Sequence, residues 1–306
     1  MHQLNIRDKI RLNAEARGDL GRTWLAQLPE IIREQERLWR IIVGRAVDGG
    51  TESYVAQTRT EDGRDAMLKI VIPGNDPTRQ ELRTLQAADG RGYARLIRSD
   101  ATNNILLLER LGPNLHASGR SEDEILAIIC ATLREAWMPQ PDGPPFATGA
   151  AKAEELAATI TRLQAQLSGP CPQRAVDRAL DFAESRRRAF DPALSVLAHG
   201  DAHEWNTLSV PATSQFKFVD PDGAFAERAY DLAVPMREWG PAIPPGDLLA
   251  LGRRRAALLS RLSGIEEHPI WEWSLIQCVW NGLLLKEIGD DDGAAVEFAM
   301  ADAWTV

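Results

Sequence analysis

The stretch that decides the fold is HGDAHEWN, residues 199–206, which is followed fourteen residues after its asparagine by Asp220. Asp220 ends the short apolar run FKFV at residues 216–219. A carboxylate such as that of Asp201 can accept a proton from a hydroxyl group. Amide and carboxylate oxygens are the ligands that a hard divalent cation such as Mg²⁺ prefers. The stretch therefore predicts one polar loop and one strand end, which together supply a candidate base, Asp201, and two candidate metal ligands, Asn206 and Asp220.

The spacing within the loop points to one kind of chemistry. A histidine precedes Asp201 by two residues and an asparagine follows it by five, as in the H-R-D-x-x-x-x-N catalytic loop of kinases. In that loop the aspartate accepts the proton of the attacking hydroxyl and the asparagine holds Mg²⁺. The spacing predicts phosphoryl transfer, with Asp201 as catalytic base and Asn206 and Asp220 as metal ligands.

Two other interpretations fit part of the loop. Asp and Asn side chains often cap turns, which would explain an isolated His-x-Asp tripeptide better than it explains the longer pattern. Alternatively, His199, Asp201 and His203 could ligate zinc in a metallohydrolase. No other cluster of candidate ligands completes that set, since the remaining histidines are His2, His116 and His268.

The N-terminal half carries a second group of candidate residues. Lys69 lies in the mostly apolar run MLKIV at residues 67–71, and Glu81 follows it by twelve residues on an expected helix. Kinases hold the α- and β-phosphates with a strand lysine that pairs with a helix glutamate. Either residue alone would be interpreted as a solvated side chain; the two in this order indicate the ion pair.

A possible phosphate-covering turn, DGGTES at residues 48–53, lies between two expected strands. The backbone N–H groups there, including that of Gly50, and the Ser53 hydroxyl could bind phosphate oxygens. The turn is not G-x-G-x-x-G, and a plain hairpin would have the same sequence features.

Hydrophobic periodicity predicts a strand-rich first part. Apolar residues at three- and four-residue steps over the first forty residues indicate two helices, with Pro29 opening the second. Five strands are expected at residues 41–47, 54–59, 66–72, 94–98 and 104–111, the first three in a meander. A helix is expected between the third and fourth strands, with Asp76 as N-cap and Asp89-Gly90 at its end.

After Gly112-Pro113 the pattern becomes mainly helical, beginning with Ser121 and Glu124 at capping-box spacing. Further helical stretches are expected near residues 150–168, 172–189, 246–262 and 268–304, and residues 194–222 are expected to form strand, loop and strand. The sequence thus predicts an α+β bilobal protein. Its N-terminal nucleotide-binding lobe with hinge would span residues 1–112, and its catalytic and acceptor-binding lobe residues 113–306.

Composition excludes several classes of protein. The 306 residues carry a net charge of -9, which argues against a nucleic-acid binder because phosphate neutralisation requires excess Lys and Arg. The charged N-terminus is unlike a signal peptide, no stretch of 18 apolar residues occurs, and the three cysteines suggest neither a disulfide framework nor a zinc motif. We therefore expect a cytoplasmic protein with a small-molecule partner, without membrane or nucleic-acid binding; the composition leaves the oligomeric state open.

The order of these motifs resembles the aminoglycoside phosphotransferase family. The resemblance runs from about residue 20 to the C-terminus and rests on GGTES at 49–53, Lys69, Glu81, LLERL at 107–111, HGDAHEWN at 199–206 and VDPDG at 219–223. The segments WLAQLP at 24–29 and ERAYDLA at 227–233 are similar to the branch of streptomycin 6-phosphotransferases and hydroxyurea antibiotic-resistance kinases. The resemblance implies a protein-kinase-like fold, ATP as phosphate donor and Mg²⁺ as cofactor.

The resemblance also implies roles for further residues. The Glu109 carbonyl and the Leu111 N–H are the expected hinge contacts to the purine, with Leu108 facing the adenine. His203 would lie near the transferred phosphate or form a hydrogen bond inside the loop. His199 and Asp231 would brace the loop.

The acceptor is less well defined by the sequence. Candidate acidic residues for a cationic acceptor are Glu227, Glu238, Glu266, Glu267 and Asp290–Asp292. Tryptophans 271, 273 and 280 are expected in the core, with stacking on a sugar as the alternative. The expected function is phosphorylation of a hydroxyl on an aminoglycoside such as streptomycin. The alternatives are a kinase for a sugar, an amino alcohol or a hydroxyurea-like compound, and a non-catalytic nucleotide-binding pseudokinase.

Overall fold

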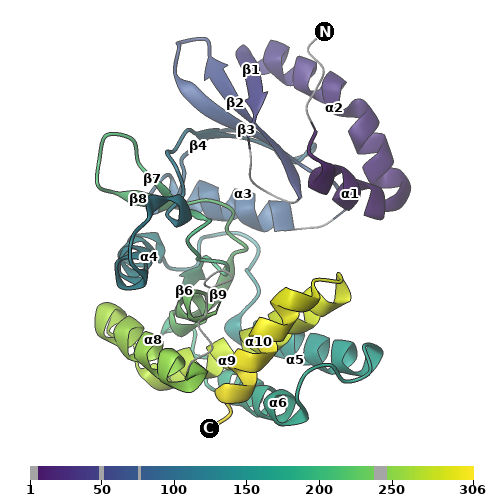
Figure 1. Cartoon of the computed structure of the whole chain (residues 1–306). Helices are drawn as coiled ribbons and strands as arrows, with labels where there is room; N and C mark the ends of the chain where they lie inside the picture. Colours follow the sequence, from purple (N-terminus) through teal and green to yellow (C-terminus); the bar gives the residue numbers. More distant parts are fainter. Residues whose placement is uncertain (1–5, 48–51, 75–76, 238–246) are drawn as a thin grey trace. The chain divides into compact units, whose positions relative to one another are not determined.

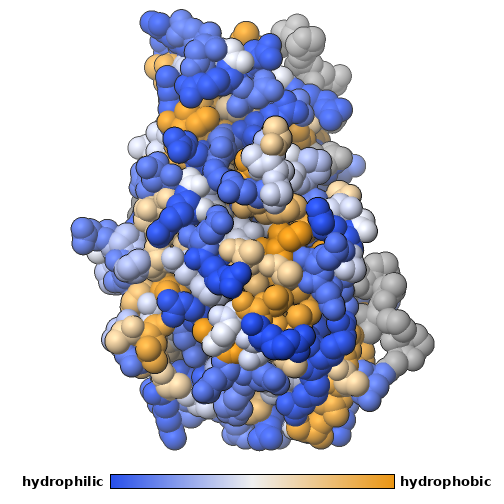
Figure 2. All heavy atoms as spheres, turned by 90° about the vertical axis from the view of Figure 1, so that its left-hand side faces the viewer, coloured by the Kyte–Doolittle hydropathy of each residue, from blue (hydrophilic) through white to orange (hydrophobic). Residues whose placement is uncertain are grey.

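The computed structural model describes residues 6–47, 52–74, 77–237 and 247–306, and the chain forms two compact units (Figure 1). The first comprises Met1–Gly112 with Val210–Ala212, and the second Pro113–Ser209 with Thr213–Val306. Hydrophilic residues cover most of the face shown in Figure 2, and apolar residues form smaller areas on it. In the described part of the chain, no helix combines the length and apolar character needed to cross a membrane.

The first unit is built on a five-stranded antiparallel sheet in the order β1-β2-β3-β5-β4. Its strands are β1 (Ile41–Ala46), β2 (Ser53–Thr60), β3 (Asp65–Val71), β4 (Leu96–Asp100) and β5 (Ile105–Glu109). The predicted meander of the first three strands is confirmed, and the predicted strand boundaries differ by one or two residues. Ser53, expected in the turn, is instead the first residue of β2.

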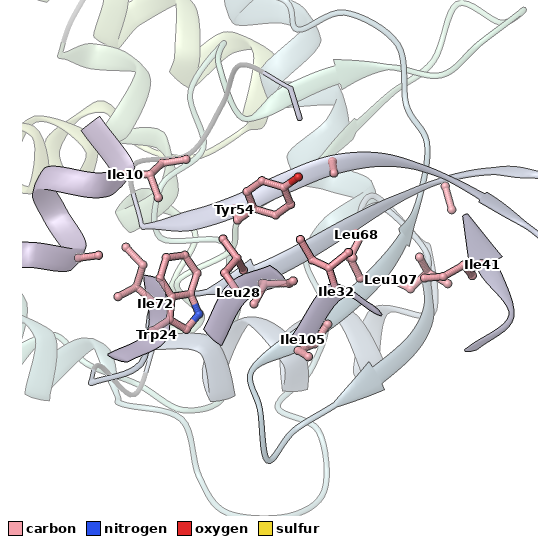
Figure 3. Close-up of a cluster of buried hydrophobic side chains, with 14 residues drawn as sticks. Ile10, Trp24, Leu28, Ile32, Ile41, Tyr54, Leu68, Ile72, Ile105 and Leu107 are labelled. Atoms are coloured by element: carbon pink, nitrogen blue, oxygen red, sulfur yellow. The ribbon is translucent and has the colours of Figure 1, made fainter. Parts of the chain in front are cut away.

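Two helices precede the sheet, α1 (Asp8–Ala16) and α2 (Gly18–Trp39). The prediction that Pro29 opens the second helix is wrong, because Pro29 lies inside α2 and the break falls at Gly18, whose φ is +66°. Proline disfavours a helix interior by removing one hydrogen bond. Here the neighbouring apolar residues Trp24, Leu28 and Ile32 are buried against the sheet (Figure 3), and this packing keeps α2 continuous.

Side-chain alternation in β3 divides the first unit into an apolar face and a polar one. Leu68 and Ile70 point into the core formed with α2, as Figure 3 shows for Leu68. Lys69 therefore points to the opposite face of the sheet, where α3 (Pro77–Ala88) supplies its partner. Asp76, the expected N-cap, lies outside the described residues.

The second unit is mainly helical, so the α+β class is confirmed. Its longer helices are α4 (Glu122–Ala136), α5 (Gly149–Gln166), α6 (Gln173–Arg188), α8 (Leu248–Ser263), α9 (Glu267–Glu287) and α10 (Asp291–Ala303), with short helices η1 (His116–Ser118), α7 (Ala229–Leu232) and η2 (Val234–Met236). The capping box predicted at Ser121 and Glu124 is present at the start of α4. Twelve residues of α9 are buried, which makes it the central helix of this unit.

Four short strands form two antiparallel pairs beside the helices. In one pair β6 (Ser195–Ala198) joins β9 (Ala224–Glu227), and in the other β7 (Thr207–Ser209) joins β8 (Phe216–Phe218). The expected strand, loop and strand over residues 194–222 was therefore incomplete, because three residues are too few to show the alternation that identifies a strand. These pairs determine where the loop at residues 199–206 begins and ends.

Candidate active site

The loop after β6 begins with His199, which is fully buried. Its Nδ1 accepts a hydrogen bond from the Asp201 N–H at 3.1 Å, so its Nε2 carries the proton and donates to the Val219 carbonyl at 3.0 Å. Burial lowers the pKa of His199 and favours this neutral form. The histidine thus joins the start of the loop to the chain immediately before Asp220.

Gly200 allows the sharp turn that follows His199. Its φ of +87° lies in the region that favours glycine, and a Cβ there would come within 3.0 Å of the Asp222 Cβ. Asp222 N–H and Gly223 N–H both donate to the His199 carbonyl. The loop and the segment after Asp220 therefore pack backbone to backbone.

Asp231, in α7, holds the first two peptides of the loop. Its carboxylate accepts hydrogen bonds from the His199 N–H at 2.9 Å, the Gly200 N–H at 2.7 Å and the Trp137 Nε1–H at 2.8 Å. Burial raises the pKa of Asp231, and these N–H donors oppose the increase by stabilising the charged form. The loop is thus anchored to a fully buried carboxylate.

Replacing Asp231 with asparagine is expected to destabilise the protein by about 1–3 kcal/mol, because at least one buried N–H would lose its acceptor. The measurement is the urea midpoint by circular dichroism. The matched control is Asp191→Asn, which changes an exposed aspartate that accepts one backbone hydrogen bond and is expected to cost less than about 0.5 kcal/mol. Equal effects of the two substitutions would show that Asp231 does not anchor the loop.

Asp201 lies at the centre of the loop with its side chain 37% exposed. Its Oδ2 accepts a hydrogen bond from His203 Nε2 at 3.2 Å and one from Asn206 Nδ2 at 3.1 Å, and its Oδ1 lies 4.0 Å from Arg237 Nη2. Burial alone would raise the pKa of Asp201, but the His203 hydrogen bond and the nearby positive charge outweigh it and lower the pKa to about 2. Asp201 is therefore a carboxylate at neutral pH.

Both ring nitrogens of His203 form hydrogen bonds within the loop. Its Nδ1 accepts from the Trp205 N–H at 3.1 Å, so Nε2 carries the proton that it donates to Asp201. This geometry favours the internal hydrogen bond over contact with a phosphate. Neither His199 nor His203 leaves a ring lone pair for zinc, and the described residues contain no group of three His, Cys, Asp or Glu side chains suited to a metal.

Asn206 and Asp220 come together through the β7–β8 pair. Asn206 directly precedes β7 and Asp220 lies two residues after β8, and the Val219 N–H donates to the Asn206 carbonyl at 3.0 Å. The Asn206 amide nitrogen donates to Asp201, which leaves the amide oxygen as a possible ligand. Asp220 has a φ of +57°, an uncommon conformation for a residue with a side chain and one found at functional sites.

In the first unit, Lys69 and Glu81 form a buried ion pair. Lys69 Nζ lies 2.8 Å from both carboxylate oxygens of Glu81, and the two side chains are 9% and 7% exposed. Ser53 is opposite Val71 and therefore lies on the same face of the sheet as Lys69. Gly50, the other residue expected to cover phosphates, lies outside the described residues.

The expected hinge follows β5. Leu108 is paired with Met67 and so shares the Lys69 face of the sheet. Glu109 ends the strand, and its carboxylate accepts from the Arg95 N–H at 2.8 Å. Among the described residues, the Leu111 N–H donates no hydrogen bond. It is therefore available as a donor to a ligand.

A cavity of about 340 Å³ in the second unit opens beside Asp201. Its lining residues are Asp201, His203, Glu204, Asp222, Val234, Pro235, Arg237, Trp280, Asn281 and Leu285. Asn281 Nδ2 donates to the buried Glu297 at 2.7 Å, so the amide oxygen of Asn281 is available as a hydrogen-bond acceptor. The wall therefore offers several oxygen acceptors and one guanidinium group.

The cavity differs from the acceptor site expected from the sequence. Trp280 lines it, whereas Trp271 and Trp273 are buried in the core. Glu227 is bound by Trp273 Nε1 and Arg186, and Asp290 caps α10. Glu238 lies outside the described residues.

Sequence reasoning missed Asp222, Arg237 and Asn281 as lining residues of the cavity. Asp222 belongs to the VDPDG motif at residues 219–223, so the sequence could have indicated it. The other two residues stand in no recognisable spacing. Trp205, which directly precedes Asn206, is half exposed and stacks on His116 with ring centroids 3.7 Å apart.

The fold and the loop define the class as a phosphotransferase with a protein-kinase-like fold. The choline kinase LicA from Streptococcus pneumoniae has a similar fold, with a TM-score of 0.62 and 14% identity over 91% of this chain and 99% of that one. A structure of LicA in complex with AMP is similar too, with a TM-score of 0.58. At this identity the similarity shows the fold alone.

Sequence comparison identifies the family. Residues 39–289 match the aminoglycoside/hydroxyurea antibiotic resistance kinase family, and the chain belongs to it. It is 27% identical to a streptomycin 6-kinase of Streptomyces glaucescens over 94% of this chain and 93% of that protein. It is also 27% identical to a hydroxyurea phosphotransferase of Kitasatospora aureofaciens over 94% of this chain and 81% of that protein. The predicted family and the predicted enzyme class, a phosphotransferase with an alcohol group as acceptor, are confirmed.

Proposed function

We propose that this protein transfers the γ-phosphate of ATP to a hydroxyl of a small, donor-rich molecule, with an aminoglycoside such as streptomycin as the leading acceptor. The observation that carries the proposal is the ionised Asp201 carboxylate, held beside Asn206 and open to the cavity. Asp201 accepts a hydrogen bond from the acceptor hydroxyl, orients it toward phosphorus and takes its proton as the O–P bond forms. Because ATP is the donor, we expect the reaction in the cytoplasm.

The first unit binds the nucleotide in this proposal. Lys69, oriented by Glu81, contacts the α- and β-phosphates, and Gly50 and Ser53 belong to the segment that covers them. The Glu109 carbonyl and the Leu111 N–H form the hydrogen bonds to the purine. The predicted ion pair at 2.8 Å supports this assignment.

Mg²⁺ fits the residues that the second unit offers. Asn206 and Asp220 supply an amide oxygen and a carboxylate, and Mg²⁺ commonly takes one or two protein ligands and completes its shell with water and substrate phosphates. The ion would offset negative charge on those phosphates. His203 acts by holding the Asp201 carboxylate in place.

The cavity binds the acceptor. Asp201, Glu204 and Asp222 are acidic and Asn281 presents an amide oxygen, so ammonium, guanidinium and hydroxyl groups are the complementary chemistry. Trp280 supplies an apolar wall for a ring. A cationic polyol such as an aminoglycoside meets these requirements.

A second acceptor class has support of its own. The volume of about 340 Å³ is near the lower end of the roughly 300–1,000 Å³ typical of small-molecule pockets, and one relative is named a hydroxyurea phosphotransferase. A small hydroxyl compound would fit without extending beyond the cavity. We keep it as the second candidate.

The test is an ADP-release assay with ATP, Mg²⁺ and one compound at a time. The panel contains streptomycin, other aminoglycosides, hydroxyurea, choline and simple sugars, with a no-acceptor control for background hydrolysis. We expect streptomycin or a related aminoglycoside to give the highest kcat/KM, and mass spectrometry to show one added phosphate. Nucleotide binding without ADP release for any compound would support a pseudokinase instead.

A further inference from the structure

Arg237 stands out among the residues that line the cavity. It directly follows η2, is 8% exposed, and has its Nη2 4.0 Å from Asp201 Oδ1. That distance is too long for a hydrogen bond. In the described part of the chain its Nε is buried without a hydrogen-bond partner, while its Nη2 is in a long ion pair with Asp201.

A buried guanidinium N–H without an acceptor is energetically costly. Such a group is found where another molecule completes its hydrogen bonds. Since Arg237 lines the cavity, a ligand group that accepts hydrogen bonds from its guanidinium would enter through the cavity.

The backbone that carries Arg237 is firmly held. The Met236 carbonyl accepts from Arg255 Nη1 at 2.8 Å, and Arg255 Nε donates to Glu122 at 2.7 Å. The Arg237 N–H donates to the Val234 carbonyl at 3.2 Å. Arg237 is therefore presented from a fixed point in the fold, as a residue with a precise role would be.

Charge limits what Arg237 can bind. The other charged residues that line the cavity are acidic, so they suit a cationic acceptor, whereas Arg237 would repel one. Arg237 suits an anion, and planar guanidinium groups bind phosphate oxygens with two parallel hydrogen bonds. The anion that the proposed reaction brings beside Asp201 is the phosphoryl group in transfer.

We propose that Arg237 is a catalytic residue that donates hydrogen bonds to the transferred phosphoryl group in the transition state and to the phosphate of the product. This inference rests on the proposed function. As the acceptor oxygen bonds to phosphorus, the bond from phosphorus to the β,γ-bridging oxygen breaks, and its electron pair stays on ADP. Asp201 takes the hydroxyl proton, and Arg237 keeps its own protons.

The kinetic test compares Arg237→Gln and Arg237→Lys with the parent protein. We expect Arg237→Gln to lower kcat by about 10²- to 10³-fold, the range for loss of a transition-state donor, with KM for the acceptor changed much less. Arg237→Lys keeps the charge but loses the planar fork, so its loss should be intermediate. The control is Arg174→Gln, which removes an exposed arginine of α6 that pairs with Asp302 of α10 and should leave kcat unchanged.

A binding test separates this inference from the proposed function. Inorganic phosphate is titrated calorimetrically into the protein with ADP and Mg²⁺, which needs no turnover. We expect the affinity of Arg237→Gln for phosphate to be at least about tenfold lower, the loss of one charge-assisted contact, with an unchanged urea midpoint. If no compound is phosphorylated, the proposed function fails while this titration still decides the role of Arg237.

The same titration in an Asp201→Asn background distinguishes two roles of Arg237: direct contact with phosphate and positioning of the Asp201 carboxylate. If Arg237 contacts phosphate, Arg237→Gln weakens binding in that background too. If it acts only by holding the Asp201 carboxylate, its effect disappears there and the inference is overturned. Equal phosphate affinity of Arg237→Gln and the parent, or no phosphate binding by either, would overturn it as well.

Discussion

Asp201→Asn is expected to reduce kcat by about 10²- to 10⁴-fold, the usual contribution of a general base. With a pKa of about 2, Asp201 is a weak base toward water but a fully ionised hydrogen-bond acceptor at neutral pH. That suits phosphoryl transfer, whose largely dissociative transition state needs an oriented hydroxyl more than early removal of its proton. Asparagine keeps the shape of the side chain and removes the charge.

The measurement pairs kcat from ADP release with the nucleotide dissociation constant from calorimetry. The nucleotide affinity should change little, because Lys69, Glu81 and the hinge belong to the first unit. Asp181→Asn, which changes an exposed carboxylate on α6, should leave both quantities unchanged. Full activity of Asp201→Asn would contradict the mechanism.

Motif spacing predicted the residues of the site that lie close together in sequence. Asp201 and Asn206 share one loop, so a fixed spacing was enough to pair them, and the β7–β8 hairpin brings Asp220 to the same place. Lys69 and Glu81 pair over twelve residues because a strand and the helix after it follow each other directly. These are local relations that a sequence can encode in its spacing.

The acceptor cavity could not be predicted in the same way. Arg237 lies 36 positions after Asp201, and Asn281 lies on α9, so their meeting depends on how several helices pack. Acidic residues were chosen from the sequence by charge alone. Glu227 was then found to be occupied by Trp273 and Arg186, because an acidic side chain is as useful in a structural ion pair as in a binding site.

Fold prediction failed where tertiary packing overrode local preference. Pro29 was expected to open the second helix, yet α2 runs through it because its apolar face covers the sheet. β7 was missed because three residues carry no periodic signal, and its strand character comes from pairing with β8. Part of the acidic excess behind the net charge of -9 lies at the cavity, where three of the charged lining groups are carboxylates.

Lys69→Met is expected to have the second large effect, on both nucleotide binding and stability. Loss of the contact between the ammonium group and the phosphates should lower kcat/KM for ATP roughly ten- to a hundredfold, the value of one or two charge-assisted hydrogen bonds. The substitution also leaves the Glu81 carboxylate buried without its cation. Removal of one partner from a buried ion pair costs about 3–5 kcal/mol.

The double variant Lys69→Met with Glu81→Leu separates these effects. It removes both charges, so its urea midpoint should recover much of the loss, because two apolar side chains can replace a buried pair at little cost. Its kcat/KM for ATP should stay low, since the phosphate contact is still missing. The control is Lys152→Met, which breaks the Lys152–Glu155 pair on α5 and should change stability by less than about 1 kcal/mol. Recovery of activity together with stability in the double variant would show that the pair supports folding alone and that phosphate binding lies elsewhere.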